Sequence, residues 1–237
     1  MDRELYLPKE WASDVDRRAE VHVPAKVGFA TKPQLAQAML ARALDAGMPA
    51  GWVTADEVYG GDARLRAFME DHDLAYVLAV KATQPLWAAS AQGPAELPAH
   101  QLVAGLPARA WRRLSAGDGA KGPRVYDWAR VALTRPGWPG RGFWLLARRR
   151  LSDGELAFYA CFGPTRTTLA ELVRWRGSAG RWRCVNHSAL IYANWLHDLG
   201  SHPGLVALSR PSGGGCTSQA GGIGAGGARR AGRCRRG

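Results

Sequence analysis

The sequence lacks any apolar run near the roughly 20 residues that a membrane-spanning helix needs. Its first residues, Met1-Asp2-Arg3-Glu4, also lack the basic and then apolar layout of a signal peptide. These two absences exclude the usual membrane and secretory patterns. We therefore expect a cytoplasmic location.

Cysteine is scarce, and neither cysteine nor histidine is arranged as metal ligands usually are. The four cysteines form no C-x-x-C pair, and their spacing fits neither a disulfide framework nor a zinc module. The six histidines are scattered, and His197 and His202 do not share the i,i+4 face of a helix that a paired metal site would use. The sequence therefore predicts reduced cysteines and no zinc site.

Acidic residues are few in the second half of the chain. Residues 1–100 hold 10 Lys and Arg against 14 Asp and Glu, whereas residues 101–237 hold 22 against 6, so balances of −4 and +16 give the formal charge of +12. Basic clusters attract nucleic acids because they neutralise phosphates and release counterions. A DNA or RNA partner explains this asymmetry, and so does an Arg-rich composition that has no partner.

The most informative stretch of the sequence is the run of residues 51–60, in which apolar residues lead to Asp56. Such a run predicts a buried strand that delivers Asp56 to its C-terminal end, with Gly60-Gly61 interrupting the chain before a helix. Ligands and metal ions usually meet open α/β sheets at such strand ends. Asp56 is therefore the candidate centre of chemistry. The alternative is that Asp56 caps a helix or occupies a turn.

A strand, helix and strand pattern surrounds Asp56. Asp62 is well placed to cap the helix that follows, and the apolar run of residues 74–80 comes directly after that helix. We expect two parallel strands joined by a right-handed helical crossover. A further helix over about residues 32–46 opens with Thr31 as its N-cap. The sequence thus predicts an α/β fold built on a βαβ unit around Asp56.

Beyond residue 80 the pattern changes to loops and short strands. Residues 81–98 are rich in Ala, Pro, Ser and Gln and are predicted to form a loop, and short helical stretches are expected near residues 99–106 and 108–115. Three runs with aromatic and β-branched residues predict an antiparallel β segment. They cover residues 124–133, 142–150 and 155–162.

The last residues are rich in Gly, Ser and Arg, and they contain too few apolar groups to offset the entropy of ordering them. The predicted organisation therefore has four parts. They are a partial α/β core in residues 1–98, an inserted helical and antiparallel β segment in residues 99–165, a helical remainder of the core in residues 166–200 and a disordered basic tail in residues 201–237.

Five segments occur in a distinctive order over about residues 3–176. They are Arg3–Trp11, Phe29–Pro33, Trp52–Gly60, Tyr76–Val80 and Ala120–Trp128. As a set they make the chain resemble bacterial insertion-sequence transposases of the DDE superfamily.

The resemblance implies an incomplete ribonuclease-H-like core. In that family three carboxylates hold two Mg²⁺ ions for cleavage and strand transfer at DNA phosphodiesters. On the family's pattern Asp56 matches the second carboxylate, which makes it the implied catalytic and metal-binding residue. The implied partners are the DNA of insertion-sequence ends, a second copy of the chain, or an intact transposase.

The other two carboxylates of the family's pattern have no counterpart in this sequence. The first Asp would precede the segment that resembles Leu5–Trp11, and where the Glu is expected the chain has Cys184-Val185-Asn186-His187. One carboxylate cannot hold two Mg²⁺ ions, because each ion takes about six oxygen ligands. We therefore expect a chain that is truncated at its N-terminus, divergent or read out of frame after about Ser178, and inactive as a nuclease by itself.

A second class of function stays open, in which the chain is a non-catalytic DNA-binding or regulatory protein that uses its basic half. The predicted DNA contacts are Lys121, Arg124, Arg148, Arg149 and Arg150. The run of three arginines could equally be a solvated strand end that resists edge pairing. A third alternative is a decayed gene product with no function.

Overall fold

The computed structural model describes residues 3–48, 51–90, 92–119, 122–135, 138–178, 188–195 and 205–209. Its strands are β1 (Arg3–Tyr6), β2 (Trp52–Ala55), β3 (Ala75–Val80), β4 (Pro85–Ser90), β5 (Gly93–Pro98), β6 (Arg112–Gly119), β7 (Gly122–Ala132), β8 (Arg141–Arg149), β9 (Leu156–Pro164), β10 (Ser188–Trp195) and β11 (Leu205–Ser209). Its helices are α1 (Lys9–Ser13), α2 (Val15–Glu20), α3 (Lys32–Asp45), α4 (Glu57–Gly60), α5 (Ala63–Asp71), α6 (Ala99–Ala104) and α7 (Leu169–Ser178), with a 3-10 turn η1 (Ala108–Ala110).

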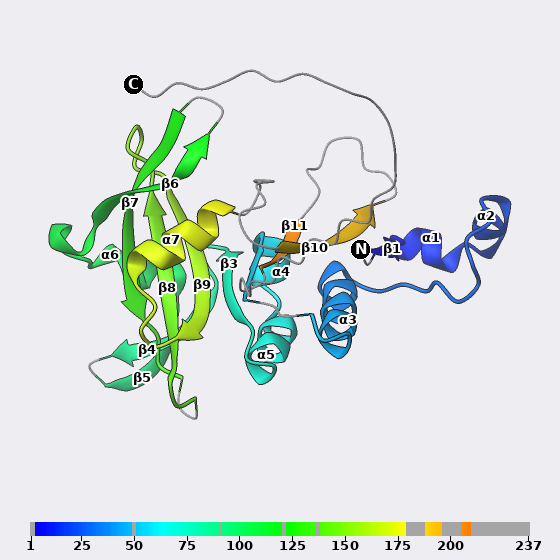
Figure 1. Cartoon of the computed structure of the whole chain (residues 1–237), viewed down its shortest axis with the longest axis horizontal. Coiled ribbons are helices and arrows are strands. Elements are labelled where there is room, and N and C mark those ends of the chain that lie inside the picture. The colour runs from blue at the N-terminus through cyan, green and yellow to red at the C-terminus, as the bar shows by residue number, and fades with distance from the viewer. Residues whose placement is uncertain are drawn as a thin grey trace, which may run out of the picture.

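These elements form a mixed α/β structure on one nine-stranded sheet, in the order β1-β10-β11-β2-β3-β9-β8-β7-β6 (Figure 1). Strands β4 and β5 make a separate two-stranded sheet. Helices α1 and α2 lie at the opposite end of the molecule from β6 and bury no residue (Figure 1). No helix in the described ranges combines the length and apolar character that crossing a bilayer requires.

The predicted βαβ unit is confirmed and lies near the centre of the large sheet. Strands β2 and β3 are parallel, with Trp52 beside Ala75 and Ala55 beside Leu78, and α4 and α5 connect them. The other side of β3 pairs antiparallel with β9, where Val80 lies beside Phe158. The three predicted strands of the antiparallel segment are β7, β8 and β9, so this segment continues the same sheet instead of standing apart from the βαβ unit.

Helices α3 and α5 begin where the sequence predicts. At the start of α3 the hydroxyl oxygen of Thr31 accepts a hydrogen bond from the backbone N–H of Gln34, and the side-chain oxygen of Gln34 accepts one from the backbone N–H of Thr31. This capping box satisfies two backbone N–H groups that a helix start leaves unpaired. In α5 the carboxylate of Asp62 accepts the N–H of Leu65 at 2.8 Å. Both caps are local interactions, which is why the sequence alone was enough to predict them.

The core has two parts, one on each face of the large sheet. One cluster joins buried residues of α3, α5 and α6 to the sheet, and the other joins α7 to the opposite face. In β3, Leu78 belongs to the first cluster and Val77 to the second, and both are fully buried. A strand that is covered on both faces needs apolar residues at successive positions, which accounts for the continuous apolar run of β3.

Two predictions for residues 81–115 are wrong. Residues 81–98 contain the hairpin of β4 and β5 instead of a loop, and residues 112–115 of the predicted second helix belong to strand β6. In β4, Leu86 and Ala88 are buried while Trp87 is exposed, which is strand alternation hidden in an Ala- and Pro-rich composition. Strand β6 holds few residues that favour strands, and its conformation follows from pairing with β7.

The predicted helical remainder and disordered tail also contain strands. Residues 188–195 form β10 and residues 205–209 form β11, and β11 pairs antiparallel with β2. The expected helix over the start of the remainder is present as α7. The other residues of the predicted tail lie outside the described ranges.

Candidate functional site

Asp56 lies where the sequence predicts, directly after β2, and it also fulfils the alternative prediction of a helix cap. Its carboxylate Oδ1 accepts the backbone N–H of Val58 at 3.0 Å, so Asp56 is the N-cap of α4. The side chain is exposed. The two interpretations are compatible, because the capping bond fixes the carboxylate at the end of the strand.

A very close contact between α4 and β3 holds the backbone that follows Asp56. A Cβ added at Gly60 would lie 1.9 Å from the carbonyl oxygen of Ala79, so only glycine allows this approach. The guanidinium of Arg66, on α5, donates a hydrogen bond to the carbonyl oxygen of Gly60. Asp56 therefore begins a short helix whose other end is fixed by both β3 and α5.

Tyr59 belongs to this helix, and its side chain is almost fully buried. Burial raises the pKa of the Tyr59 hydroxyl, and the negative charge of Asp56 raises it further. Among the described residues, the Tyr59 hydroxyl has no hydrogen-bond partner. Tyr59 thus packs α4 into the hydrophobic core and stays protonated at neutral pH.

A second carboxylate, Glu70, is buried on the same helix that carries Arg66. It accepts a hydrogen bond from the Tyr76 hydroxyl at 2.6 Å and pairs with the Arg135 guanidinium at 2.5 Å. Burial and the neighbouring charge of Glu70 raise the pKa of Tyr76. This network could not be predicted from the sequence, because Glu70 stands in an acidic run of the kind that usually ends an exposed helix.

The described residues do not fit a two-metal site. No group of three His, Cys, Asp or Glu side chains within the described ranges is close enough to hold a metal ion. The carboxylate of Glu171 is engaged locally, since it accepts the Thr168 N–H at 2.7 Å and the Thr168 hydroxyl at 2.9 Å. The segment Cys184–His187, where the family's Glu is expected, lies outside the described ranges.

Of the predicted DNA contacts, Lys121 lies outside the described residues and Arg124 makes internal bonds. The Arg124 guanidinium donates to the carbonyl oxygens of Ala116 at 3.0 Å and Gly177 at 2.7 Å. These bonds tie the last turn of α7 to β6, because a cation at a helix C-terminus satisfies carbonyl groups that the helix leaves unpaired.

The three consecutive arginines at the end of β8 also have partners within the chain. Arg148 stacks over the ring of Tyr126 at 4.7 Å. Arg149 stacks over Trp111 at 4.3 Å and pairs with Asp127. Arg150 forms ion pairs with Asp153 and Glu155. These side chains are only partly exposed or flanked by acids, and their predicted role as DNA contacts stays a prediction.

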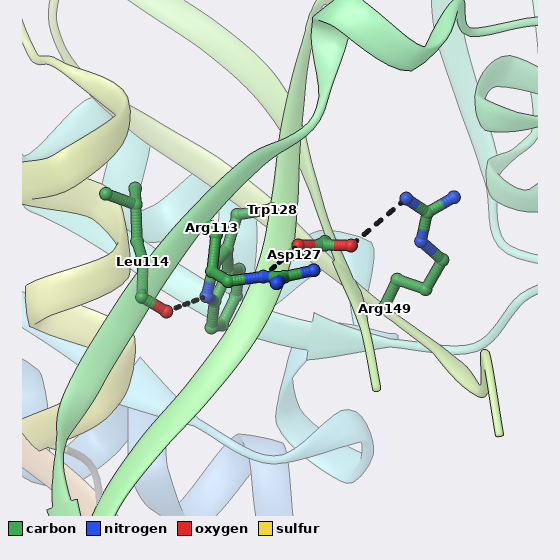
Figure 2. A network of polar contacts seen from close by, with 5 residues as sticks. All are labelled: Arg113, Leu114, Asp127, Trp128 and Arg149. Atoms are coloured by element: carbon green, nitrogen blue, oxygen red, sulfur yellow. Dashed lines mark hydrogen bonds and ion pairs between the residues drawn. The ribbon is translucent and has the colours of Figure 1, made fainter. Parts of the chain in front are cut away.

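Figure 2 shows Asp127 between two arginines from neighbouring strands. Its Oδ1 lies 3.1 Å from Nε of Arg113, on β6, and its Oδ2 lies 3.2 Å from a terminal nitrogen of Arg149, on β8. Partial burial opposes the charge of Asp127, but the hydrogen bonds from Arg113 and Arg149 outweigh it and lower the pKa of the carboxyl. Asp127 therefore stays ionised between two cations.

A comparison with protein-family models matches residues 1–137 to the DDE superfamily endonuclease model. Searches of the curated proteins and of the solved structures found no significant match. The matched region contains Asp56, the βαβ unit around it and strand β6. Because the match covers more than half of the chain, the protein belongs to the DDE superfamily of endonucleases, whose transposase-like members act on DNA and generally use divalent metal ions.

Proposed function

We propose that this chain is the DNA-processing part of an insertion-sequence transposase, built on an incomplete ribonuclease-H-like core, with Asp56 as its one retained metal-binding carboxylate. The position of Asp56 carries the proposal, because it follows the end of β2 in a parallel pair with β3 and lies inside the region that matches the family. Ligands and ions usually meet α/β sheets at that edge. The close contact at Gly60 and the bond from Arg66 keep this edge in place.

We further propose that residues 1–237 do not cleave DNA by themselves. The contacts of two other carboxylates, those of Glu70 and Glu171, support the proposed inactivity. Glu70 is buried in contacts with Tyr76 and Arg135, and Glu171 caps its own helix. A two-metal reaction needs several anionic oxygens facing one place, and Asp56 and its neighbour Glu57 supply too few.

A nicking assay on supercoiled plasmid in Mg²⁺ or Mn²⁺ tests both statements. We expect no nicking from the purified chain. Nicking that is lost in Asp56→Ala but kept in Glu57→Ala would overturn the proposed inactivity while supporting the assignment of Asp56. Nicking that persists in Asp56→Ala would remove Asp56 from the site.

The second candidate is a non-catalytic DNA-binding or regulatory protein, which would associate with DNA or with an intact transposase. The exposure of two arginines, Arg113 on the edge strand β6 and Arg150 directly after β8, favours it. Of their side chains, 66% and 44% are accessible, respectively. In this proposal the DNA phosphates are neutralised by the five basic residues predicted from the sequence, which are Lys121, Arg124, Arg148, Arg149 and Arg150.

A gel-shift series at several salt concentrations tests this candidate. We expect binding that weakens steeply with salt and that falls in the triple variant Arg148→Ala, Arg149→Ala, Arg150→Ala. A second protein that lacks residues 203–237 separates the sheet from the tail. If deletion of the tail alone abolishes binding, the contact is driven by the tail and the arginines of the sheet are not the interface.

A further inference from the structure

Asp127 is held by one arginine from each of the two strands that flank β7. The strand register places Arg113 of β6 opposite Asp127 of β7, and Asp127 opposite Arg149 of β8, so all three side chains share one face of the sheet. We call Arg113 and Arg149 the arginine clamp. Each clamp residue contacts a different oxygen of the Asp127 carboxylate (Figure 2).

The arginine clamp has the chemistry of a phosphate site that already holds an anion. Two guanidinium groups that converge on the oxygens of one anion bind carboxylate and phosphate in the same way. Arg149 is further oriented by its stacking over Trp111 at 4.3 Å. The clamp is also accessible, since 66% of the Arg113 side chain and 39% of the Arg149 side chain are exposed, against 16% for Asp127.

The clamp lies at the same end of the sheet as Asp56. Across the sheet, Val80 of β3 lies beside Phe158 of β9, Phe158 lies beside Ala147 of β8, and Ala147 lies beside Ala129 of β7. Asp127 lies two residues beyond Ala129, in the direction in which β3 ends. Strand β2 is parallel to β3 and ends in that direction too. Four strand spacings separate β2 from β7, which is roughly 19 Å along a flat sheet.

We propose that Asp127 is a built-in competitor of DNA phosphate. In the free protein its carboxylate occupies the arginine clamp, and a phosphodiester of bound DNA takes its place, so that Asp127 weakens DNA binding at this end of the sheet. The inference rests on the proposed function, because it requires DNA to lie across the sheet end that carries Asp56. Asp127 acts by reducing the charge of the clamp from two positive groups to a net of one.

The test compares Asp127→Asn with Asp153→Asn in a gel shift on a 30-base-pair duplex of random sequence. Each variant removes one negative charge, but only Asp127→Asn frees the clamp, because Arg150 keeps Glu155 when Asp153 is replaced. We expect Asp127→Asn to bind about tenfold more tightly at about 0.1 M salt, with a plot of log affinity against log salt steeper by about one. We expect Asp153→Asn to change affinity less than about twofold.

Two further arms separate the possible failures. Adding Arg113→Gln and Arg149→Gln to Asp127→Asn should abolish the gain, and Asp127→Ser should reproduce it if the Asn variant folds poorly. If the duplex is bound but Asp127→Asn and Asp127→Ser bind no better than Asp153→Asn, the inference is wrong and the proposed function stands. If no variant binds the duplex, the proposed function itself fails.

Discussion

At the scale of single residues, two buried tyrosines, Tyr59 of α4 and Tyr76 of β3, differ in one hydrogen bond. The Tyr76 hydroxyl donates to Glu70, whereas the Tyr59 hydroxyl has no partner among the described residues. Tyr76→Phe should lower the free energy of unfolding by about 1–3 kcal/mol, because it removes one of the partners of a buried carboxylate. Tyr59→Phe is the matched control and should be neutral or slightly stabilising. Urea unfolding measures both, and equal effects would contradict the assigned contacts.

The same two tyrosines should set an alkaline limit to stability. Burial raises the pKa of each above its usual value of about 10. A raised pKa in the folded state stabilises the fold fully below about pH 10 and loses that contribution as the pH rises further. The double variant Tyr59→Phe, Tyr76→Phe should therefore show a smaller decline in melting temperature between pH 9 and pH 11. An unchanged decline would assign it to other groups.

Gly60 offers a sharper test of the edge that carries Asp56. Gly to Ala inside a helix usually stabilises by about 0.5–1 kcal/mol, but here the new methyl group would meet the Ala79 carbonyl oxygen at 1.9 Å. Gly60→Ala should cost about 2 kcal/mol or more, because α4 must move away from β3. Gly28→Ala is the control, since no atom lies within 4 Å of the added Cβ. A stable Gly60→Ala protein would show that α4 does not sit this close.

At the scale of elements, helix α7 depends on its attachment to β6. A Cβ at Gly177 would lie 2.0 Å from the Ala116 carbonyl oxygen, and Arg124 bonds to both backbone segments. Arg124→Ala should speed hydrogen exchange across residues 169–178, with a loss of about 1–2 kcal/mol. Arg124→Lys should do the same, because one ammonium group is not the planar fork that reaches both carbonyls.

A control for Arg124 lies on the same helix. Arg174 is exposed and stacks over Trp175, so Arg174→Ala should leave exchange in α7 nearly unchanged. The variants also separate two roles of Arg124: if Arg124→Lys loosens α7 but binds DNA as tightly as the unmodified chain, the contact to α7 is structural and DNA needs only the positive charge there. If α7 exchanges as slowly in both Arg124 variants as in Arg174→Ala and the unmodified chain, Arg124 does not hold the helix.

Elements with local signals could be predicted from the sequence. Helix α3 has its capping box at Thr31, α5 has Asp62, and β2 and β3 have apolar runs long enough to identify. Strands β5 and β6 have no such signal. Strand β6 contains Arg, Gly and Asp, and it is a strand because its backbone pairs with that of β7. A local sequence pattern does not contain this pairing.

The same division applies to the candidate site. Asp56 could be predicted, because its position follows from the strand that ends before it. The partners of Asp127 could not, because Arg113 and Arg149 come from strands on either side, 14 and 22 positions away in the chain. Charge composition predicted that arginines gather in the second half, but it could not show that acidic residues within the chain already engage several of them.

At the scale of the whole molecule, the pairing of β3 with β9 makes the βαβ unit dependent on the antiparallel strands. Phe158, Ala160 and Phe162 belong to the same buried cluster as Val53 and Leu78. Residues 1–98 alone should therefore remain largely unfolded by circular dichroism, since β3 would lose a neighbour and part of its core. The full chain is the control and should unfold cooperatively. A cooperative transition in residues 1–98 would instead support an independent core with the predicted boundary.

The pairing of β3 with β9 also has a consequence in time. Val80 lies beside Phe158, so roughly 80 residues must be added before β3 can meet its partner. At about 5–20 residues per second, synthesis of that stretch takes roughly 4–16 s. During those seconds the edge of β3 that later pairs with β9 has no partner. The speed of translation over residues 81–157 therefore sets how long this apolar strand can pair with other chains.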